Sequence, residues 1–293
     1  MGKTPCRKAG KLELSVKTLC DIEDPLTRAR EASELAATYQ TAIAELSRIR
    51  REALEQLVAA GMSQSQIAER LGMTRARVGQ LLSTGPKAER AFLGSGKLTI
   101  AVGGKLEAKT TKPGPVVAQE DFQAYEAFQE LARTVGLETC YEVIHPPGMI
   151  NLNRDNLVVI CGPRLSPLIA QVLASDHHLG FEQDDAGWYL IDRVEDKKYR
   201  SPMDDGESSD YAYLGRLPRL DGRGSFLYIA GIHAVGAAGV VHYLDHHLTE
   251  LYREVKTRRF STIIRCAFDA GTRRIESSKR VTALYKTEGT DAR

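Results

Sequence analysis

The segment 61–82 constrains the fold more than any other part of the chain. Its residue types are spaced as they must be in two short helices joined by a tight turn. Ser63 and Thr74 each precede one predicted helix, where a hydroxyl can accept a hydrogen bond from a first-turn amide. Gly72 stands at the turn, where glycine tolerates a positive φ. The contact between the helices would use small or apolar side chains, namely Ile67, Ala68, Leu71, Met73, Val78 and Leu81.

The second predicted helix presents side chains that suit a DNA surface. Arginine can bind guanine through two hydrogen bonds, glutamine can bind adenine, and an arginine can equally hold a phosphate, so the division between base and backbone contacts stays open. An ordinary helical hairpin with a basic, solvated face is the alternative. We predict that double-stranded DNA is the partner, contacted by Ser63, Gln64, Gln66, Thr74, Arg75, Arg77 and Gln80.

Residues 63–82, SQSQIAERLGMTRARVGQLL, resemble the region 4 helix-turn-helix of bacterial sigma factors and the actinomycete regulators built on that module. The resemblance is tight over about 25 residues and looser over about 60. It implies a DNA-binding transcriptional regulator. Gly79 departs from a good helix sequence, because glycine inside a helix costs about 1 kcal/mol relative to alanine. We interpret it as a point where the backbone approaches DNA.

Length and composition indicate two globular domains in a chain of 293 residues, with 42% hydrophobic and 27% charged residues. No apolar run reaches the roughly 18 residues of a membrane span, and the start lacks the apolar core of a secretory signal. We therefore expect a cytoplasmic protein with no membrane partner. The five cysteines are scattered without a CxxC pair, and His242 and His246 lack a third ligand nearby in sequence, so neither metal nor cofactor is expected.

Charge is divided unevenly along the chain. Residues 1–97 carry 16 positive and 11 negative side chains, a net +5, which leaves −3 for residues 98–293 because the whole chain carries +2. This basic excess suits phosphate neutralisation. We predict a flexible arm over residues 1–24 and a helix-turn-helix domain over 25–93. Within the latter, residues 25–60 have a helical period and form one long helix or two, which we expect to pack on the motif and to pair with a second copy.

Residues 97–287 predict an α/β domain with a mostly parallel, Rossmann-like sheet and an antiparallel C-terminal hairpin, because strand and helix patterns alternate. Helices are expected at 120–135, 166–174 and 237–255. Strands are expected at 97–107, 140–145, 156–161, 211–217 and 225–232, with a hairpin around 181–193 and a closing pair at 260–268 and 274–285.

Two junctions in this domain share one pattern. An apolar strand ends in Gly162-Pro163-Arg164 and a helix follows near Ser166, and a second strand ends in Gly231-Ile232-His233 before Gly236 and another helix. Open α/β sheets bind ligands at such strand ends, where helix amides attract anions. Alternatively, the glycines only permit tight turns. We predict a shared pocket at Gly162, Pro163, Arg164, Ser166, Gly231, His233 and Gly236.

The sequence therefore favours a transcriptional regulator whose C-terminal domain senses a small, anionic or nucleotide-like effector or mediates assembly. Homodimers or higher oligomers are expected, because two half-sites usually supply specific affinity. The alternative is a nucleoside- or nucleotide-processing enzyme, such as a deoxyribosyltransferase or hydrolase, fused to the helix-turn-helix. Its acid would come from the loops between residues 184 and 210, and Cys161 is either a nucleophile or a core residue; no catalytic residue is assigned.

Overall fold

The computed structural model describes residues 16, 18–108 and 110–287. The chain divides into two compact units, residues 1–86 and 87–293. Most of the predicted flexible arm lies outside the described residues. The predicted first domain ended at residue 93, but α5 (Arg90–Leu93) belongs to the second unit, because Phe92 and Leu93 are buried in its core.

The first unit consists of α2 (Pro25–Ala59), α3 (Gln64–Leu71) and α4 (Arg75–Thr84). The 35-residue α2 is a single helix, which begins at an Asp24 N-cap whose carboxylate accepts a hydrogen bond from the Thr27 amide at 2.8 Å. Its C-terminal part packs on α3 and α4 through a small core, made of Leu54, Ile67, Ala68, Val78 and Leu81. Of the residues expected at the contact between the two short helices, Met73 is partly buried, Leu71 is half exposed and the others are buried.

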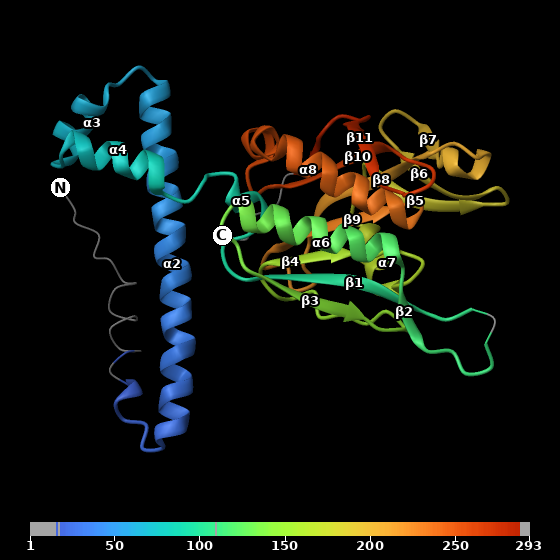
Figure 1. Cartoon of the computed structure of the whole chain (residues 1–293), viewed down its shortest axis with the longest axis horizontal. Helices are drawn as coiled ribbons and strands as arrows, with labels where there is room; N and C mark the ends of the chain where they lie inside the picture. The colour runs from blue at the N-terminus through green and yellow to red at the C-terminus, as the bar shows by residue number, and fades with distance from the viewer. Residues whose placement is uncertain (1–15, 17, 109, 288–293) are drawn as a thin grey trace. The chain divides into compact units, whose positions relative to one another are not determined.

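The second unit contains a nine-stranded mixed sheet among its described residues, in the order β11-β10-β8-β9-β4-β1-β2, with β3 also paired to β1 and β12 to β10. Strands β3, β1, β4 and β9 are parallel neighbours, and β8, β10, β11, β12 and β2 join antiparallel. Figure 1 shows the arrangement. The strands are β1 (Leu98–Leu106), β2 (Pro115–Val117), β3 (Thr139–Ile144), β4 (Leu157–Ile160), β8 (Ser209–Pro218), β9 (Ser225–Gly231), β10 (Arg259–Phe268), β11 (Ile275–Arg280) and β12 (Tyr285–Thr287).

Alternating side chains bury both faces of this sheet, as a pleated strand requires. Ile100 and Val158 face a core shared with α5, α6 (Gln119–Thr134) and α8 (Ala234–Val255), and α6 lies beside α8 (Figure 1). Ala101 and Val159 face the opposite core, which α7 (Pro167–Leu173) and a three-stranded meander cover. The meander consists of β5 (Leu179–Asp184), β6 (Gly187–Asp192) and β7 (Lys197–Arg200), and η1 (Pro202–Asp205) follows it.

The predicted helical part, sheet and antiparallel C-terminal hairpin are present, and several details differ. The single strand expected over 274–285 is two strands, β11 and β12, and β2 was not predicted. Strands β8 and β9 form an antiparallel hairpin, because the short segment 219–224 cannot hold a crossover helix. Strand β7 was not predicted, since its four residues, KKYR, are too few and too charged to show an alternating pattern. Helix α8 begins at Ala234, three residues earlier than expected, so Gly236 lies in its first turn.

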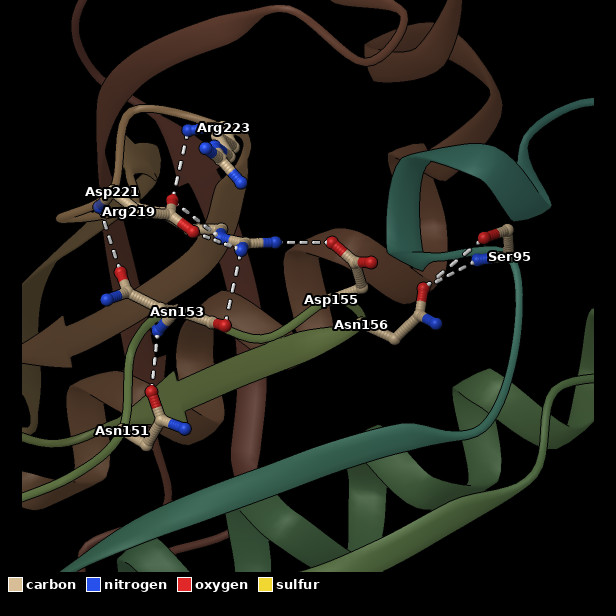
Figure 2. A network of polar contacts seen from close by, with 8 residues as sticks. All are labelled: Ser95, Asn151, Asn153, Asp155, Asn156, Arg219, Asp221 and Arg223. Atoms are coloured by element: carbon tan, nitrogen blue, oxygen red, sulfur yellow. Dashed lines mark hydrogen bonds and ion pairs between the residues drawn. The ribbon is translucent and has the colours of Figure 1, made fainter. Parts of the chain in front are cut away.

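A polar network closes the edge of the sheet where β4 and β9 begin (Figure 2). The Arg219 guanidinium forms ion pairs with Asp155 at 2.6 Å and Asp221 at 2.5 Å and donates to the Asn153 carbonyl at 3.2 Å. The Ser95 amide donates to the Asn156 side chain at 3.0 Å. The network thus joins the β8–β9 hairpin to the loop before β4, and that loop to the start of β1.

Candidate nucleic-acid interface and strand-end crevice

Three of the predicted DNA-binding side chains cap the helices of the first unit. The Ser63 hydroxyl accepts from the Gln66 amide at 3.3 Å, and the Gln66 side chain accepts from the Ser63 amide at 2.9 Å, which is a capping box. The Thr74 hydroxyl accepts from the Arg77 amide at 3.2 Å. Gly72 ends α3 with φ 64°, a left-handed conformation that favours glycine. These caps fix where both helices begin, and all three side chains remain exposed.

The outward side of α4 carries the candidate base-reading groups. Arg75, Arg77 and Gln80 are exposed. Arg77 Nη1 donates to Gln80 Oε1 at 2.6 Å, so these two side chains are held together at the surface. Within the described part of the chain, Arg75 makes no hydrogen bond or ion pair and is available to a partner. The arrangement supplies a free guanidinium beside an amide and a second guanidinium, as contacts to bases and phosphates need.

Gly79, interpreted above as a point of close approach to DNA, lies on the side of α4 that faces α3. A Cβ placed there would lie 3.5 Å from Gln64 Oε1, so this side of α4 is turned toward α3. Gln64 is half-buried at that contact, unlike the other predicted DNA-binding residues. Sequence reasoning also missed Arg51 of α2, whose guanidinium donates to the Gly85 carbonyl and ties the end of α4 to the long helix.

The two junctions predicted to form a pocket do converge. Strands β4 and β9 are parallel neighbours, with Ile160 level with Ile229, so both end at the same edge of the sheet. A crevice of about 30 Å³ lies between them, which is room for one or two water molecules and far below the volume of a drug-sized pocket. Its lining residues come from two helices, two strands and the loop after β4, namely Asp121, Ile160, Cys161, Gly162, Arg164, Leu165, Ile229, Ala230, Gly231, Ala234 and Ala237.

Of the seven residues predicted to bind a ligand, only Gly162, Arg164 and Gly231 line this crevice, and Pro163 lies between two of them. Ser166 does not, because its fully buried hydroxyl is the N-cap of α7. It accepts from the Ile169 amide at 3.3 Å and donates to the Gly148 carbonyl at 2.6 Å, which leaves no donor for a ligand. Its position before a helix was the correct part of the prediction.

His233 and Gly236 are engaged with Asp210, a residue of β8. The His233 amide donates to Asp210 Oδ2 at 2.9 Å, and its ring Nε2 lies 2.8 Å from Asp204 Oδ1. A Cβ at Gly236 would lie 2.5 Å from Asp210 Oδ2 and 2.8 Å from the Gly231 Cα, so both glycines permit close backbone contact. Burial raises the pKa of Asp210 to about 6. A protein carboxyl therefore already occupies part of the α8 N-terminus.

Asp121 is the residue that sequence reasoning missed. It stands in the first turn of α6, where an acidic residue is ordinarily interpreted as a favourable helix-dipole partner. The fold instead places it against Cys161 and Arg164 in the crevice. Burial, with the nearby Glu120 carboxylate, raises the pKa of Asp121 to about 7, despite the opposing effect of Lys105 and Arg164. Burial also raises the pKa of Cys161 to about 12, which keeps this thiol protonated and unsuited to nucleophilic attack.

Several of the other polar candidates have structural partners. Asp184 pairs with Arg200 across the meander, and Asp192 accepts from the Tyr285 hydroxyl at 2.8 Å. His242 Nδ1 lies 2.7 Å from the Ser278 hydroxyl, and His246 contacts the His242 carbonyl. Across the residues that the structure describes, no group of three or more His, Cys, Asp or Glu side chains could hold a metal ion.

Comparison with known proteins gives one finding. Residues 37–85 match the family model described as Sigma-70, region 4. This segment covers most of α2 together with α3 and α4, so the first unit contains a sigma-region-4-like helix-turn-helix of the DNA-binding kind. No curated protein and no solved structure matches the chain, so the Rossmann-like character of the second unit stays a prediction. Among the described helices, none is both long and apolar enough to cross a bilayer.

Proposed function

We propose that this protein is a transcriptional regulator that reads operator DNA with α4. The observation that carries the proposal is a sigma-region-4-like helix-turn-helix whose capped second helix exposes Arg75, Arg77 and Gln80. Arg75 is the leading candidate for a base contact, because its guanidinium is free, while Arg77 is already oriented by Gln80. Phosphate contacts position a protein on DNA without reading its sequence. The N-terminal ends of α3 and α4 suit such contacts, because they expose Ser63, Gln66 and Thr74.

We also propose that two copies act together through α2. Ile43, Leu46 and Ile49 follow one another at intervals of three residues and are 62%, 66% and 49% exposed. They form an apolar stripe that a second α2 could cover, as in a helical pair. A second copy is the favoured occupant because helix-turn-helix proteins usually bind as dimers, with one recognition helix on each of two half-sites about one helical turn apart. Replacing Ile43 and Leu46 by Glu should then give a monomer in light scattering, whereas an unchanged mass would exclude this interface.

The second unit is proposed to sense a small anionic or nucleotide-like effector at the crevice between β4 and β9. The supporting observations are the exposed Arg164, the glycines at both junctions and the position of the crevice at the carboxyl ends of parallel strands. An effector would change operator affinity only if it bound two states of the protein differently.

DNA binding is tested with duplexes selected from a random-sequence pool by the full chain. If they read bases, Arg75→Ala and Arg77→Ala should each weaken binding to the selected sequence by about 1 to 3 kcal/mol at fixed salt. If they hold phosphates, each variant should weaken binding to selected and unselected duplexes alike, and a salt titration should show a shallower salt dependence. Arg223→Ala is the matched control, because Arg223 is an exposed arginine of the second unit. Unchanged affinity in the folded double variant would contradict the proposed role of α4.

A further inference from the structure

Two charged side chains reach the crevice from different elements and are left unengaged. Asp121 projects from the first turn of α6, and Arg164 from the loop between β4 and α7. Within the described part of the chain, neither side chain forms a hydrogen bond or an ion pair. A partly buried carboxylate that accepts no hydrogen bond from the protein lowers the stability of the folded state, because its lost hydration is not replaced.

We propose that this crevice binds an oxyanion group of a small ligand, held by the Arg164 guanidinium and by a hydrogen bond donated from the Asp121 carboxyl. This inference deepens the effector part of the proposed function and rests on it. The ligand class is a compound carrying a phosphate, sulfate or carboxylate group. The crevice, with a volume of about 30 Å³, admits the oxygen atoms at one end of such a group and leaves the rest of the ligand outside.

The rest of the lining includes small residues that suit an anion. Gly162, Gly231 and Ala234 are among them, and at these positions no large side chain covers the backbone. Ala234 opens the 22-residue α8, whose dipole places partial positive charge at this end of the helix. The Asp210 carboxyl, which accepts from the His233 amide, already offsets part of that charge, so Arg164 supplies most of the attraction for an anion. A divalent cation does not fit, because Asp121 is the one carboxylate among the lining residues and Arg164 would repel it.

A carboxyl can donate only while it holds its proton. The pKa of Asp121, raised to about 7, leaves it mostly protonated at pH 6 and mostly ionised at pH 8. Desolvation and Glu120 favour the neutral form, whereas Lys105 and Arg164 favour the ionised form. Tyr141 and Cys161 also face it, and both remain neutral because their pKa values are raised. A neutral carboxylic acid donating to a bound anion is established carboxyl chemistry.

Ligand affinity should therefore fall as pH rises. With a pKa of about 7, the protonated fraction of Asp121 falls about tenfold between pH 6 and pH 8, and affinity for an oxyanion should fall by up to the same factor. Asp210 lies near the same end of the strands, and its pKa, raised to about 6, makes it a second source of pH dependence. The variant Asp121→Asn separates the pH dependence due to Asp121 from that due to other groups, because an amide donates at every pH and carries no charge.

The experiment measures sulfate binding to the full chain without DNA, from the saturable rise in Tm with sulfate at matched ionic strength. Sulfate is chosen because its own charge is constant between pH 6 and pH 8. Wild-type protein should bind it about tenfold more tightly at pH 6. Asp121→Asn should keep the tighter binding at both pH values, and Arg164→Ala should lose the saturable part. Asp185→Asn and Arg223→Ala are exposed control variants that should behave as wild type.

Three results would overturn the proposal: sulfate binding that is equal at both pH values, a pH dependence that persists in Asp121→Asn, or saturable binding that survives Arg164→Ala. Melting curves without sulfate check that each variant is folded. Operator affinity, measured separately with and without sulfate, tests the effector role. Sulfate binding that follows the predicted pattern without any change in operator affinity would retain the site and reject only its coupling to DNA.

Discussion

Charged side chains are paired at one end of the central strands β4 and β9 of the nine-stranded sheet and unpaired at the other end. Where β4 and β9 begin, Arg219 is paired with Asp155 and Asp221 and is only 10% exposed (Figure 2). Where the same strands end, Asp121 and Arg164 line a crevice and form no ion pair within the described residues. Paired charges join loops to one another. Unpaired charges cost stability, and proteins retain such costs mainly at sites that bind or react.

The sharpest test of this contrast is the stability of Asp121→Asn. A carboxyl whose pKa is raised from 3.8 to about 7 by folding destabilises the folded state by on the order of 4 kcal/mol once it is ionised. Removing the charge should therefore raise the free energy of unfolding at pH 8 by up to that amount. The gain in the free energy of unfolding is measured by chemical denaturation, from the unfolding transition of the second unit.

The sign of this effect sets its pH window. The unfolded chain releases the proton near pH 4, whereas the folded chain keeps it to about pH 7, so wild-type stability falls between these values and is constant above them. The gain from Asp121→Asn should grow across the same window and level off above pH 7. A gain that is equal at pH 4 and pH 8 would mean that the Asp121 charge is not the cause.

Ionisation of Asp210 should also lower the free energy of unfolding as pH rises, but by less than ionisation of Asp121, because the pKa of Asp210 rises only to about 6. Asp210→Asn keeps an acceptor for the His233 amide but cannot ionise, so the part of the stability loss between about pH 4 and pH 6 should disappear. Denaturation at pH 4.5 and pH 7 in both proteins checks this. If the variant retains the full wild-type pH dependence, Asp210 is not the buried acid that titrates.

The sequence predicted what local patterns determine. Residues 61–82 showed caps, a turn glycine and apolar spacing, so both short helices and their core were predicted, and the family match supports them. The junctions at Gly162 and Gly231 were predicted to meet because parallel strands share an edge. Asp121 could not be predicted, since its role depends on α6 packing beside strands that are distant in sequence. For the same reason, the burial of Ser166 could not be predicted, and the sequence indicated a ligand-binding role for it.

At the paired edge, Arg219→Ala should lower the Tm of the second unit. It would leave the Asp155 and Asp221 carboxylates beside each other without their shared cation and would free the β8–β9 hairpin from the Asn153 carbonyl. Arg219→Lys should restore only part of the loss, because a single ammonium cannot match a guanidinium that contacts three groups. Sulfate binding should be unchanged in both variants, and a change would show that the two edges are coupled.

The smallest expected effect belongs to Arg164→Ala in the absence of ligand. Arg164 is exposed and, within the described residues, forms no hydrogen bond or ion pair, so its removal should change the free energy of unfolding by less than about 0.5 kcal/mol. Its positive charge slightly opposes the raised pKa of Asp121, so a small loss confined to pH values above 7 is consistent with the arrangement. Denaturation of the variant beside Arg219→Ala makes the comparison direct. Equal losses from the two arginines would mean that both edges of the sheet are built for stability and that the crevice is not a ligand site.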